Sequence, residues 1–336
     1  MADNIRVITD VRQIDMEKVE QFVYTHPNGN FFQSTKAYYF FKSVESYQPV
    51  FFIAKEQNEI AGTLLAIVIK EGKGLKGYLS RRCIIWGGPI VGNENQEVYS
   101  LLLNELNKII TQKAIYTEFR NFFDHSNHKE TFDNVGFEFN EHLNFIVSVS
   151  SLEVSKRKLS KSKIAQINKS IKNGTEIIQA TCIEDVRSFY RILDTLYKDK
   201  VKKPIASFGF FQKFFEDESL GKYLLIKKNN RVIGGIMCPV YKDKIYEWFV
   251  CGMDGKFKDI YPSVLATWAP IEYAANNGLK FFDFMGAGKP NDDYGVREFK
   301  SKFGGELVNY GRFVKVNNQP LFNLGKLGLK ILKKIK

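Results

Sequence analysis

Residues 53–62 read IAKEQNEIAG, and residues 226–235 read IKKNNRVIGG. Each stretch begins as an apolar strand, passes through a polar turn and enters a second strand through Ile that ends on Gly, a pattern that predicts a β-hairpin. The two stretches align without a gap, 173 residues apart from Ile53 to Ile226. Such a repeat predicts that one domain occurs twice in the chain.

Weaker matches continue the repeat downstream in the same order. Two further pairs of segments resemble each other: 115–119 (IYTEF) with 280–284 (KFFDF), and 136–139 (GFEF) with 304–307 (GGEL). The first pair places Glu118 on Asp283. The spacing of apolar residues also predicts an amphipathic helix in each half, near residues 97–112 and 263–277. The shared order indicates duplication of one α/β domain.

The length fits this duplication. A chain of 336 residues is too long for one ordinary domain and suits two of about 150 residues each. A boundary is predicted near residue 150, where the strand-like segment FIVSVSSLEV ends. We therefore predict one domain at 1–150, a second at 151–318 and a basic amphipathic tail at 319–336. The predicted fold class is α/β, with mixed sheets of the α+β kind.

Basic residues follow this boundary closely. The net charge of the chain is +12, which favours anionic partners. Between Glu153 and Glu176 there is no acid, and the stretch contains seven basic residues: Lys156, Arg157, Lys158, Lys161, Lys163, Lys169 and Lys172. A helix is predicted here that stops at Gly174. Its basic face is either an ordinary solvated surface or a surface that faces tRNA, lipid phosphate or nucleotide.

Several classes of protein are disfavoured by what the sequence lacks. The first ten residues hold no apolar run, and no segment approaches 18 apolar residues, so we expect a cytoplasmic protein without a membrane-spanning helix. The four cysteines form no CxxC pair and are expected to be reduced. His125 and His128 are three residues apart in a polar stretch, which we interpret as a solvated loop and not as a metal site.

At residues 261–313 the sequence YPSVLATWAPIEYAANNGLKFFDFMGAGKPNDDYGVREFKSKFGGELVNYGRF resembles the C-terminal domain of the Fem-type (FemA/FemB/FemX) peptidyltransferases. These are tandem-domain relatives of the Gcn5-related N-acetyltransferases. Three further segments are similar to motifs of the family: NFFQSTKAYYFFK (30–42), IIWGGPIV (84–91) and SKSKIAQINKSIKNG (160–174). The resemblance implies two tandem Gcn5-related acyltransferase-like domains.

The resemblance also implies a reaction and its residues. Members of the family transfer an amino acid from aminoacyl-tRNA to an amine of a peptidoglycan precursor, without a bound cofactor or metal. Lys300 matches the family lysine that places positive charge near the developing oxyanion or leaving oxygen, and Phe299 matches its neighbour. Substrate-binding roles are implied for six other residues: Lys42, Lys198, Tyr261, Asp293, Tyr294 and Arg297.

The residues themselves leave other roles open. By spacing alone, Lys300 is more typical of a surface lysine on a helix than of a catalytic residue. Asp292 or Asp293 is expected to cap that helix, and Tyr261 is also placed to begin a helix that has Pro262 in its first turn.

Two substrate-binding assignments carry their own alternatives. Lys36 is a rival for the role of Lys42. Lys198 stands where the family tends to have an arginine on the precursor phosphates, and a lysine cannot form the bidentate fork there. The identity of the precursor therefore stays open.

Two glycine-rich stretches do not form the nucleotide sites that they resemble. GAGKP (286–290) lacks the spacing of a phosphate-binding loop. RVIGGI (231–236) approaches the acetyltransferase pyrophosphate pattern but lies in a predicted hairpin, whereas that pattern requires a turn into a helix. The poor match to the pyrophosphate pattern makes an acyl-CoA-dependent N-acyltransferase of envelope or capsule sugars the alternative function, after aminoacyl transfer from tRNA. A non-catalytic basic module that binds RNA or membrane is the third.

The last segment, LFNLGKLGLKILKKIK (321–336), predicts an amphipathic basic helix. Leu321, Leu324, Ile331, Leu332 and Ile335 oppose five lysines: Lys326, Lys330, Lys333, Lys334 and Lys336. Such a helix is typical of peripheral contact with the inner face of a membrane. The alternative is a tail that packs on the body of the protein.

Overall fold

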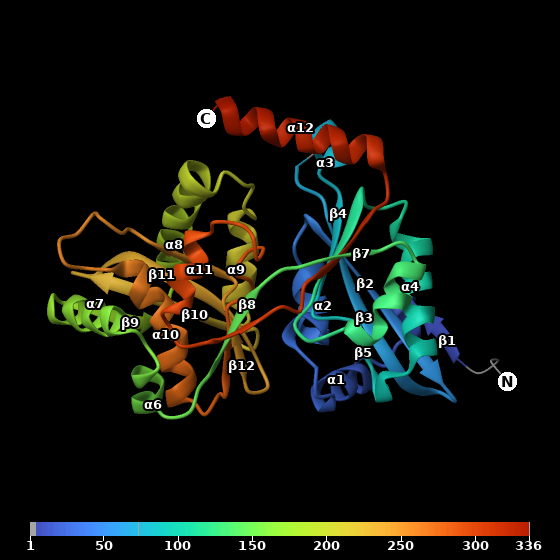
Figure 1. Ribbon diagram of the computed structural model, residues 1–336, viewed down its shortest axis with the longest axis horizontal. Helices are drawn as coiled ribbons and strands as arrows, with labels where there is room; N and C mark the ends of the chain where they lie inside the picture. Colours follow the sequence, from blue (N-terminus) through green and yellow to red (C-terminus); the bar gives the residue numbers. More distant parts are fainter. Residues whose placement is uncertain (1–4, 73, 336) are drawn as a thin grey trace. The chain divides into compact units, whose positions relative to one another are not determined.

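The computed structural model describes residues 5–72 and 74–335, without the side chains of residue 76 and residues 328–335. The chain forms two compact units. Unit 1 comprises residues 1–141 and 310–336, and unit 2 comprises residues 142–309. Figure 1 shows a sheet with helices packed against it in each unit. The predicted mixed α/β class is confirmed.

Unit 1 contains one mixed sheet in the order β1-β2-β3-β4-β6-β16-β7, with β5 paired to β3. Its strands are β1 (Ile5–Ile8), β2 (Tyr47–Glu56), β3 (Glu59–Ile69), β4 (Arg82–Trp86), β5 (Ile90–Val91), β6 (Tyr116–Arg120), β7 (Glu138–Asn140) and β16 (Arg312–Val316). Its α-helices are α1 (Met16–Thr25), α2 (Thr35–Lys42), α3 (Gly74–Leu79), α4 (Gln96–Ile110), α5 (Lys129–Asn134) and α12 (Gln319–Ile335).

Unit 2 contains the same sheet, read as β9-β10-β11-β12-β14-β8-β15, with β13 paired to β11. Its strands are β8 (Asn144–Ser148), β9 (Thr175–Gln179), β10 (Gly221–Lys228), β11 (Arg231–Tyr241), β12 (Lys244–Tyr246), β13 (Phe249–Gly252), β14 (Phe281–Asp283) and β15 (Glu306–Val308). Its α-helices are α6 (Leu152–Arg157), α7 (Lys161–Lys172), α8 (Ile183–Leu196), α9 (Phe208–Glu216), α10 (Pro262–Asn276) and α11 (Gly295–Ser301).

The two sheets are equivalent strand by strand, which confirms the predicted duplication. The hairpins β2/β3 and β10/β11 occupy the same place, and the one parallel pair within the described strands is β4/β6 in unit 1 and β12/β14 in unit 2. The helices predicted near 97–112 and 263–277 are α4 and α10. Each packs on the hairpin of its own unit. Strand positions in one half therefore have direct counterparts in the other.

The register of the predicted repeat is wrong by one residue. The hairpin turns are Gln57-Asn58 and Asn229-Asn230, and all four residues have positive φ. These turns are 172 residues apart, from Gln57 to Asn229, and not 173. Because successive strand residues point to opposite faces, the ungapped sequence alignment places each side chain on the wrong face of the sheet.

The predicted domain boundaries at 150 and 318 also differ from the structure. Strand β8 belongs to the sheet of unit 2, and β16 returns to the sheet of unit 1, where it lies between β6 and β7. Counted along the chain, β8 is the eighth strand of the first repeat and β16 is the eighth strand of the second. The two units have thus exchanged their last strands. A boundary drawn at a change of composition cannot reveal this exchange.

Each unit has its own hydrophobic core. In unit 1 the core lies between the sheet and α4. Asn95 caps the start of this helix, because its side chain accepts hydrogen bonds from the amides of Glu97 and Val98. In unit 2 the core surrounds α10, where Trp268 is fully buried. Helix α7 ends before Gly174, whose φ is +76°, as its sequence predicts.

Candidate active site

Lys300 is a buried ammonium in unit 2. Its Nζ donates hydrogen bonds to the carbonyl oxygens of Phe284 (3.0 Å) and Gly286 (2.8 Å) and forms an ion pair with Glu247 Oε1 (2.7 Å). The side chain is 10% exposed. An ammonium has three protons, and here three acceptors surround it. Lys300 is therefore neither a surface lysine nor a free donor that points into solvent.

Arg297 lies one turn before Lys300, on the same side of α11. Its guanidinium donates to the carbonyl oxygens of Ala287 (3.0 Å), Pro290 (2.8 Å) and Asp292 (2.9 Å), and also to that of Lys289. Together the two cations bind six carbonyl oxygens of residues 284–292, the segment that joins β14 to α11. The donors that we assigned to substrate binding at Arg297 are thus occupied by its own chain.

A buried carboxylate that the sequence analysis did not single out faces Lys300. Glu247 follows β12, and its amide donates to Asp283 O (2.9 Å). Burial raises the pKa of Glu247, Lys300 opposes this shift, and the charge of Asp283 adds to it. A lone acid in the apolar stretch KIYEWFV is the sequence signal that could have identified this residue.

Asp283 is fully buried at the end of β14. Its Oδ1 accepts hydrogen bonds from Asn144 Nδ2 (2.7 Å) and the amide of Met285 (2.8 Å), while Oδ2 has no hydrogen-bond partner among the described residues. Asn144 in turn accepts from the amide of Gly286 (2.7 Å). Two carboxylates and one ammonium therefore share this interior, and the carboxylates are in excess.

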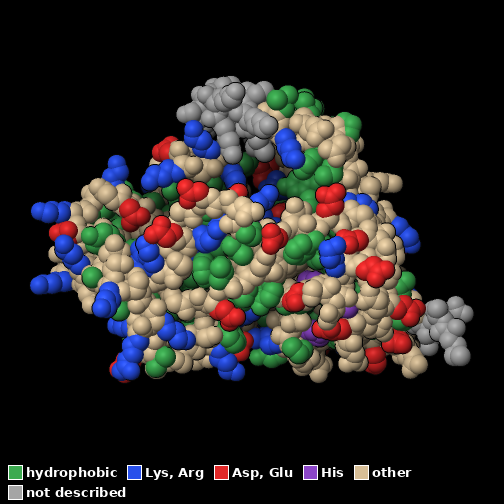
Figure 2. Space-filling view, viewed as in Figure 1, with side chains coloured by type: hydrophobic (Ala, Val, Ile, Leu, Met, Phe, Trp, Pro, Cys, Tyr) green, Lys and Arg blue, Asp and Glu red, His purple; other side chains and the backbone are tan. Residues whose placement is uncertain are grey.

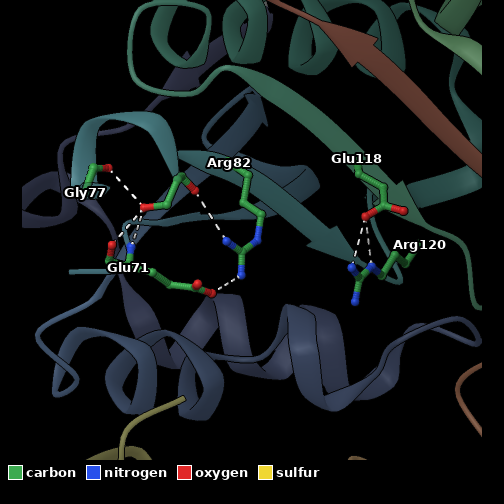
Figure 3. A network of polar contacts seen from close by, with 6 residues as sticks. Glu71, Gly77, Arg82, Glu118 and Arg120 are labelled. Atoms are coloured by element: carbon green, nitrogen blue, oxygen red, sulfur yellow. Dashed lines mark hydrogen bonds and ion pairs between the residues drawn. The ribbon is translucent and has the colours of Figure 1, made fainter. Parts of the chain in front are cut away.

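Unit 1 has the opposite charge balance at the equivalent place. Glu118 pairs with Ile84 across β4/β6 as Asp283 pairs with Tyr246 across β12/β14. Glu118 forms ion pairs with Arg120 (3.0 Å) and Arg312 (2.6 Å). Figure 3 shows the Glu118–Arg120 pair. Burial alone would raise the pKa of Glu118, but the two arginines outweigh it and hold this pKa at about 2.

The counterpart of Glu247 in unit 1 is apolar. Ile85 follows Ile84 as Glu247 follows Tyr246, and Ile85 is fully buried. The same sheet therefore folds with a hydrocarbon at this position. The pair of Glu247 and Lys300 is a property of unit 2 and not a requirement of the fold.

Phe299 packs beside Lys300 against the core of unit 2. Its ring centroid lies 5.2 Å from that of Phe303, and Lys163 Nζ lies 4.2 Å from the centre of the Phe299 ring. Burial lowers the pKa of Lys163. Helix α7 thus turns one of its predicted surface lysines inward. Lys and Arg side chains also gather on the part of unit 2 where Figure 1 places α7 (Figure 2).

Tyr261 and Lys198 lie in unit 2 but have no described contact with Lys300. The amide of Tyr261 donates to Ser170 Oγ (3.0 Å), and Pro262 begins α10 directly after it. Lys198 lies in a π-helical turn (Tyr197–Val201), is 63% exposed and pairs with Asp194 Oδ2 at 2.6 Å. The substrate-binding roles that the resemblance implies for these two residues remain predictions.

The other predicted binding residues are on the surface. Lys42 ends α2 in unit 1, with its Nζ 5.6 Å from the centre of the Tyr38 ring. Asp293 is exposed, and Tyr294 is 42% exposed. The predicted aspartate cap is wrong, because Tyr294 occupies the cap position of α11 and makes no capping hydrogen bond with its side chain. The hydrogen bonds from Arg297 to carbonyl oxygens of residues 287–292 hold this end of the helix instead.

The expected solvated loop at His125 and His128 is also wrong. His125 is 2% exposed and His128 is 5% exposed. His128 stacks on Tyr99 with ring centroids 3.7 Å apart, and burial lowers the pKa of His125 to about 3. Among the described residues, no group of three or more His, Cys, Asp or Glu side chains is placed to hold a metal ion.

Comparisons with known proteins agree with this architecture. Residues 221–328 match the FemAB family model, a span that contains Glu247, Asp283 and Lys300. The chain is 22% identical to the aminoacyltransferase FemA of Staphylococcus aureus over 391 aligned positions, covering 87% of this chain and 91% of FemA.

Solved structures show the same fold. The crystal structure of FemX superposes with a TM-score of 0.72 at 16% identity and covers 95% of this chain and 99% of FemX. A tandem GNAT protein from the clavulanic acid biosynthesis pathway gives a TM-score of 0.55 at 7% identity, covering 94% of this chain and 99% of that protein. With the two equivalent sheets, these similarities show that the chain shares the two-unit fold of these structures and that residues 221–328 resemble the FemAB family.

Proposed function

We propose that this enzyme transfers an amino acid from aminoacyl-tRNA to an amine of a peptidoglycan or other cell-envelope precursor. The observation that carries the proposal is the buried ammonium of Lys300, held by Glu247 within the span that matches the FemAB model. The similarity to an aminoacyltransferase over most of the chain supports it. The net charge of +12 suits a donor and an acceptor that both carry phosphates.

The chemistry needs little more than placed charge. An aminoacyl ester is already activated, so a neutral amine attacks its carbonyl carbon, the C–O bond to the tRNA breaks, and the leaving oxygen takes up a proton. A fixed positive charge near the developing negative charge lowers the barrier, since no reorganisation is needed during the reaction. In this proposal Lys300 supplies that charge, and the three acceptors that hold its ammonium in a partly dry environment support the assignment.

The structure disfavours acyl-CoA as the donor at the glycine-rich stretch of unit 2. Gly234 and Gly235 lie inside β11, paired to β10 on one side and to β13 on the other. A Cβ on Gly235 would lie 2.7 Å from Leu225 Cδ2. These glycines therefore serve strand packing, and their amides do not form a turn that offers hydrogen bonds to a pyrophosphate.

The decisive experiment supplies both kinds of donor. The protein is incubated with tRNA charged with radiolabelled amino acids, or with labelled acyl-CoA, together with nucleotide- and lipid-linked cell-wall precursors. Transfer of label from tRNA to a precursor is the expected result, and it should stop when the precursor amine is blocked. Transfer from acyl-CoA alone would establish the alternative reaction. Binding without transfer from either donor would contradict an enzymatic role.

We also propose that α12 places the enzyme at the membrane surface. Within the described residues, no helix is both long and apolar enough to cross a membrane. Leu324 and Leu327 are 51% and 55% exposed, while Phe322 packs on Tyr116 with ring centroids 5.5 Å apart. The predicted apolar residues Ile331, Leu332 and Ile335, with Lys330, Lys333, Lys334 and Lys336, lie outside the described side chains.

The double variant Leu324→Gln/Leu327→Gln should bind anionic vesicles at least about tenfold more weakly, because each leucine buried in lipid contributes about 1.5–3 kcal/mol. Sedimentation with vesicles measures this, and added salt should weaken the binding of the unchanged protein. The matched control is Leu75→Gln, a leucine of unit 1 that is 73% exposed outside α12. Equal binding by the double variant and the control would show that α12 is not the anchor.

A further inference from the structure

We propose that Glu247 is the positioning residue of the transferase site, since it keeps Lys300 charged and in place for the reaction. The proposal rests on the proposed function for its consequence in catalysis, but the pair itself is tested without the reaction. Glu247 Oε1 lies 2.7 Å from Lys300 Nζ, and the side chains are 7% and 10% exposed. Among the three acceptors of Lys300, it is the one that carries a charge.

A charged pair at this depth needs an explanation other than stability. Buried ion pairs contribute little net stability, because desolvation of both groups offsets their attraction. The equivalent position in the first sheet is Ile85, fully buried, so the fold is built equally well with a hydrocarbon there. The carboxylate is therefore placed for what it does to Lys300.

The carbonyl groups of Phe284 and Gly286 could not replace Glu247 as partners of Lys300. The oxygens of Phe284 and Gly286 accept hydrogen bonds from Nζ, but they bring no counter-charge. Without a counter-charge, burial favours the neutral amine, which cannot stabilise negative charge on an oxyanion or a leaving oxygen. Glu247 thus supplies the counter-charge of the buried ammonium of Lys300.

The groups around Glu247 also predict its response to pH. Lys300 from α11, Asp283 from β14 and Cys238 from β11 all interact with it electrostatically. Burial and Asp283 raise the pKa of Glu247, and burial keeps Cys238 as the neutral thiol by raising its pKa. As the pH falls through the raised pKa of Glu247, the carboxylate takes a proton and Lys300 loses its counter-charge. Turnover should therefore fall on the acid side of the pH profile.

The first test measures the reactivity of Lys300 with an amine-acylating reagent, followed by mass spectrometry of the intact, folded chain at one pH. In Glu247→Gln, Lys300 should react about tenfold faster than in the unchanged protein, because more of it is in the neutral, reactive form. Glu247→Asp retains the charge and should return the rate toward that of the unchanged protein. Thermal unfolding identifies any variant that is not folded.

The matched control is the exposed pair of Lys198 and Asp194. Its ammonium and carboxylate lie 2.6 Å apart, as close as the buried pair, but Lys198 is 63% exposed. In Asp194→Asn the labelling rate of Lys198 should change by about twofold or less, because water replaces the lost partner. Unchanged labelling of Lys300 in folded Glu247→Gln would overturn the proposal.

The second test uses the reaction. Glu247→Gln should lower kcat with little change in KM and should change the acid limb of kcat, leaving only the part that comes from protonation of the acceptor amine, whereas Glu247→Asp should keep the limb of the unchanged protein. An acid limb in Glu247→Gln that is identical to that of the unchanged protein would also overturn the proposal. If no donor and acceptor pair reacts in the unchanged protein, the proposed function fails, and the labelling result still determines whether Glu247 controls the charge of Lys300.

Discussion

Replacing Lys300 with methionine should lower turnover by about 10²-fold or more, because it removes the fixed positive charge that we propose to act on the leaving oxygen. The same change should also destabilise the chain. It leaves Glu247 buried without its ion-pair partner, and breaking a buried pair in this way costs about 3–5 kcal/mol. A loss of activity in the single variant therefore has two causes.

The double variant Lys300→Met/Glu247→Gln separates these causes. It removes both charges together, so most of the lost stability should return, since removal of both partners of a buried pair is nearly neutral. Turnover should stay low. Thermal unfolding and transfer of label from charged tRNA are measured on the unchanged protein, both single variants and the double variant.

The pair also predicts how the effects combine. If Glu247 acts through Lys300, changing Glu247 in a chain that already lacks Lys300 should not lower turnover further, so the two effects should be far from additive. Recovery of activity together with stability in the double variant would show that Lys300 only supports the fold. The catalytic assignment would then be wrong.

Ending the chain after Asn309 should unfold unit 1, whereas ending it after Asn318 should not. The shorter chain lacks β16, which is hydrogen-bonded to β6 on one side and β7 on the other. It also lacks Phe313, which is 1% exposed and stacks on Phe132 at 3.9 Å. Loss of an inner strand and its core aromatic exceeds the roughly 5–15 kcal/mol by which a domain is stable.

Hydrogen exchange measures this strand by strand. In the chain that ends after Asn309, β6 and β7 should lose protection, and β10 and β11 should retain it. The chain that ends after Asn318 is the matched control, because it lacks only α12 and Lys336. Retained protection of β6 and β7 in the shorter chain would mean that another segment, such as β8, takes the place of β16. That result would contradict the requirement for β16.

Local sequence patterns were sufficient to predict the repeat and the main helix of each half. The polar turns at 57–58 and 229–230, each between apolar runs, are signals that lie within ten residues. The apolar spacing in α4 and α10 is likewise read over a few turns. The one-residue error in register arose because aligned letters do not show which residues of a turn adopt positive φ. That choice depends on how the two strands of each hairpin pair.

The roles of the predicted site residues depended on contacts between distant segments. The lysine at 300 was identified through its resemblance to a family, but nothing near it in sequence shows that it points inward. Its partners Glu247 and Phe284 lie 53 and 16 residues away along the chain. Arg297 was predicted to bind substrate for the same reason. It binds backbone carbonyl groups, and a pattern of side chains in the sequence does not reveal such contacts.

The sequence by itself determined that one mixed α/β domain occurs twice, where its hairpins and main helices lie, and which lysine merits attention. These features follow from periodicity and turn chemistry, which act between near neighbours. Only the tertiary structure decided that β8 and β16 are exchanged and that Glu247 holds Lys300 in a partly dry interior. Both depend on which strands come together, and burial then sets the charge of a group according to neighbours that are far away in the sequence.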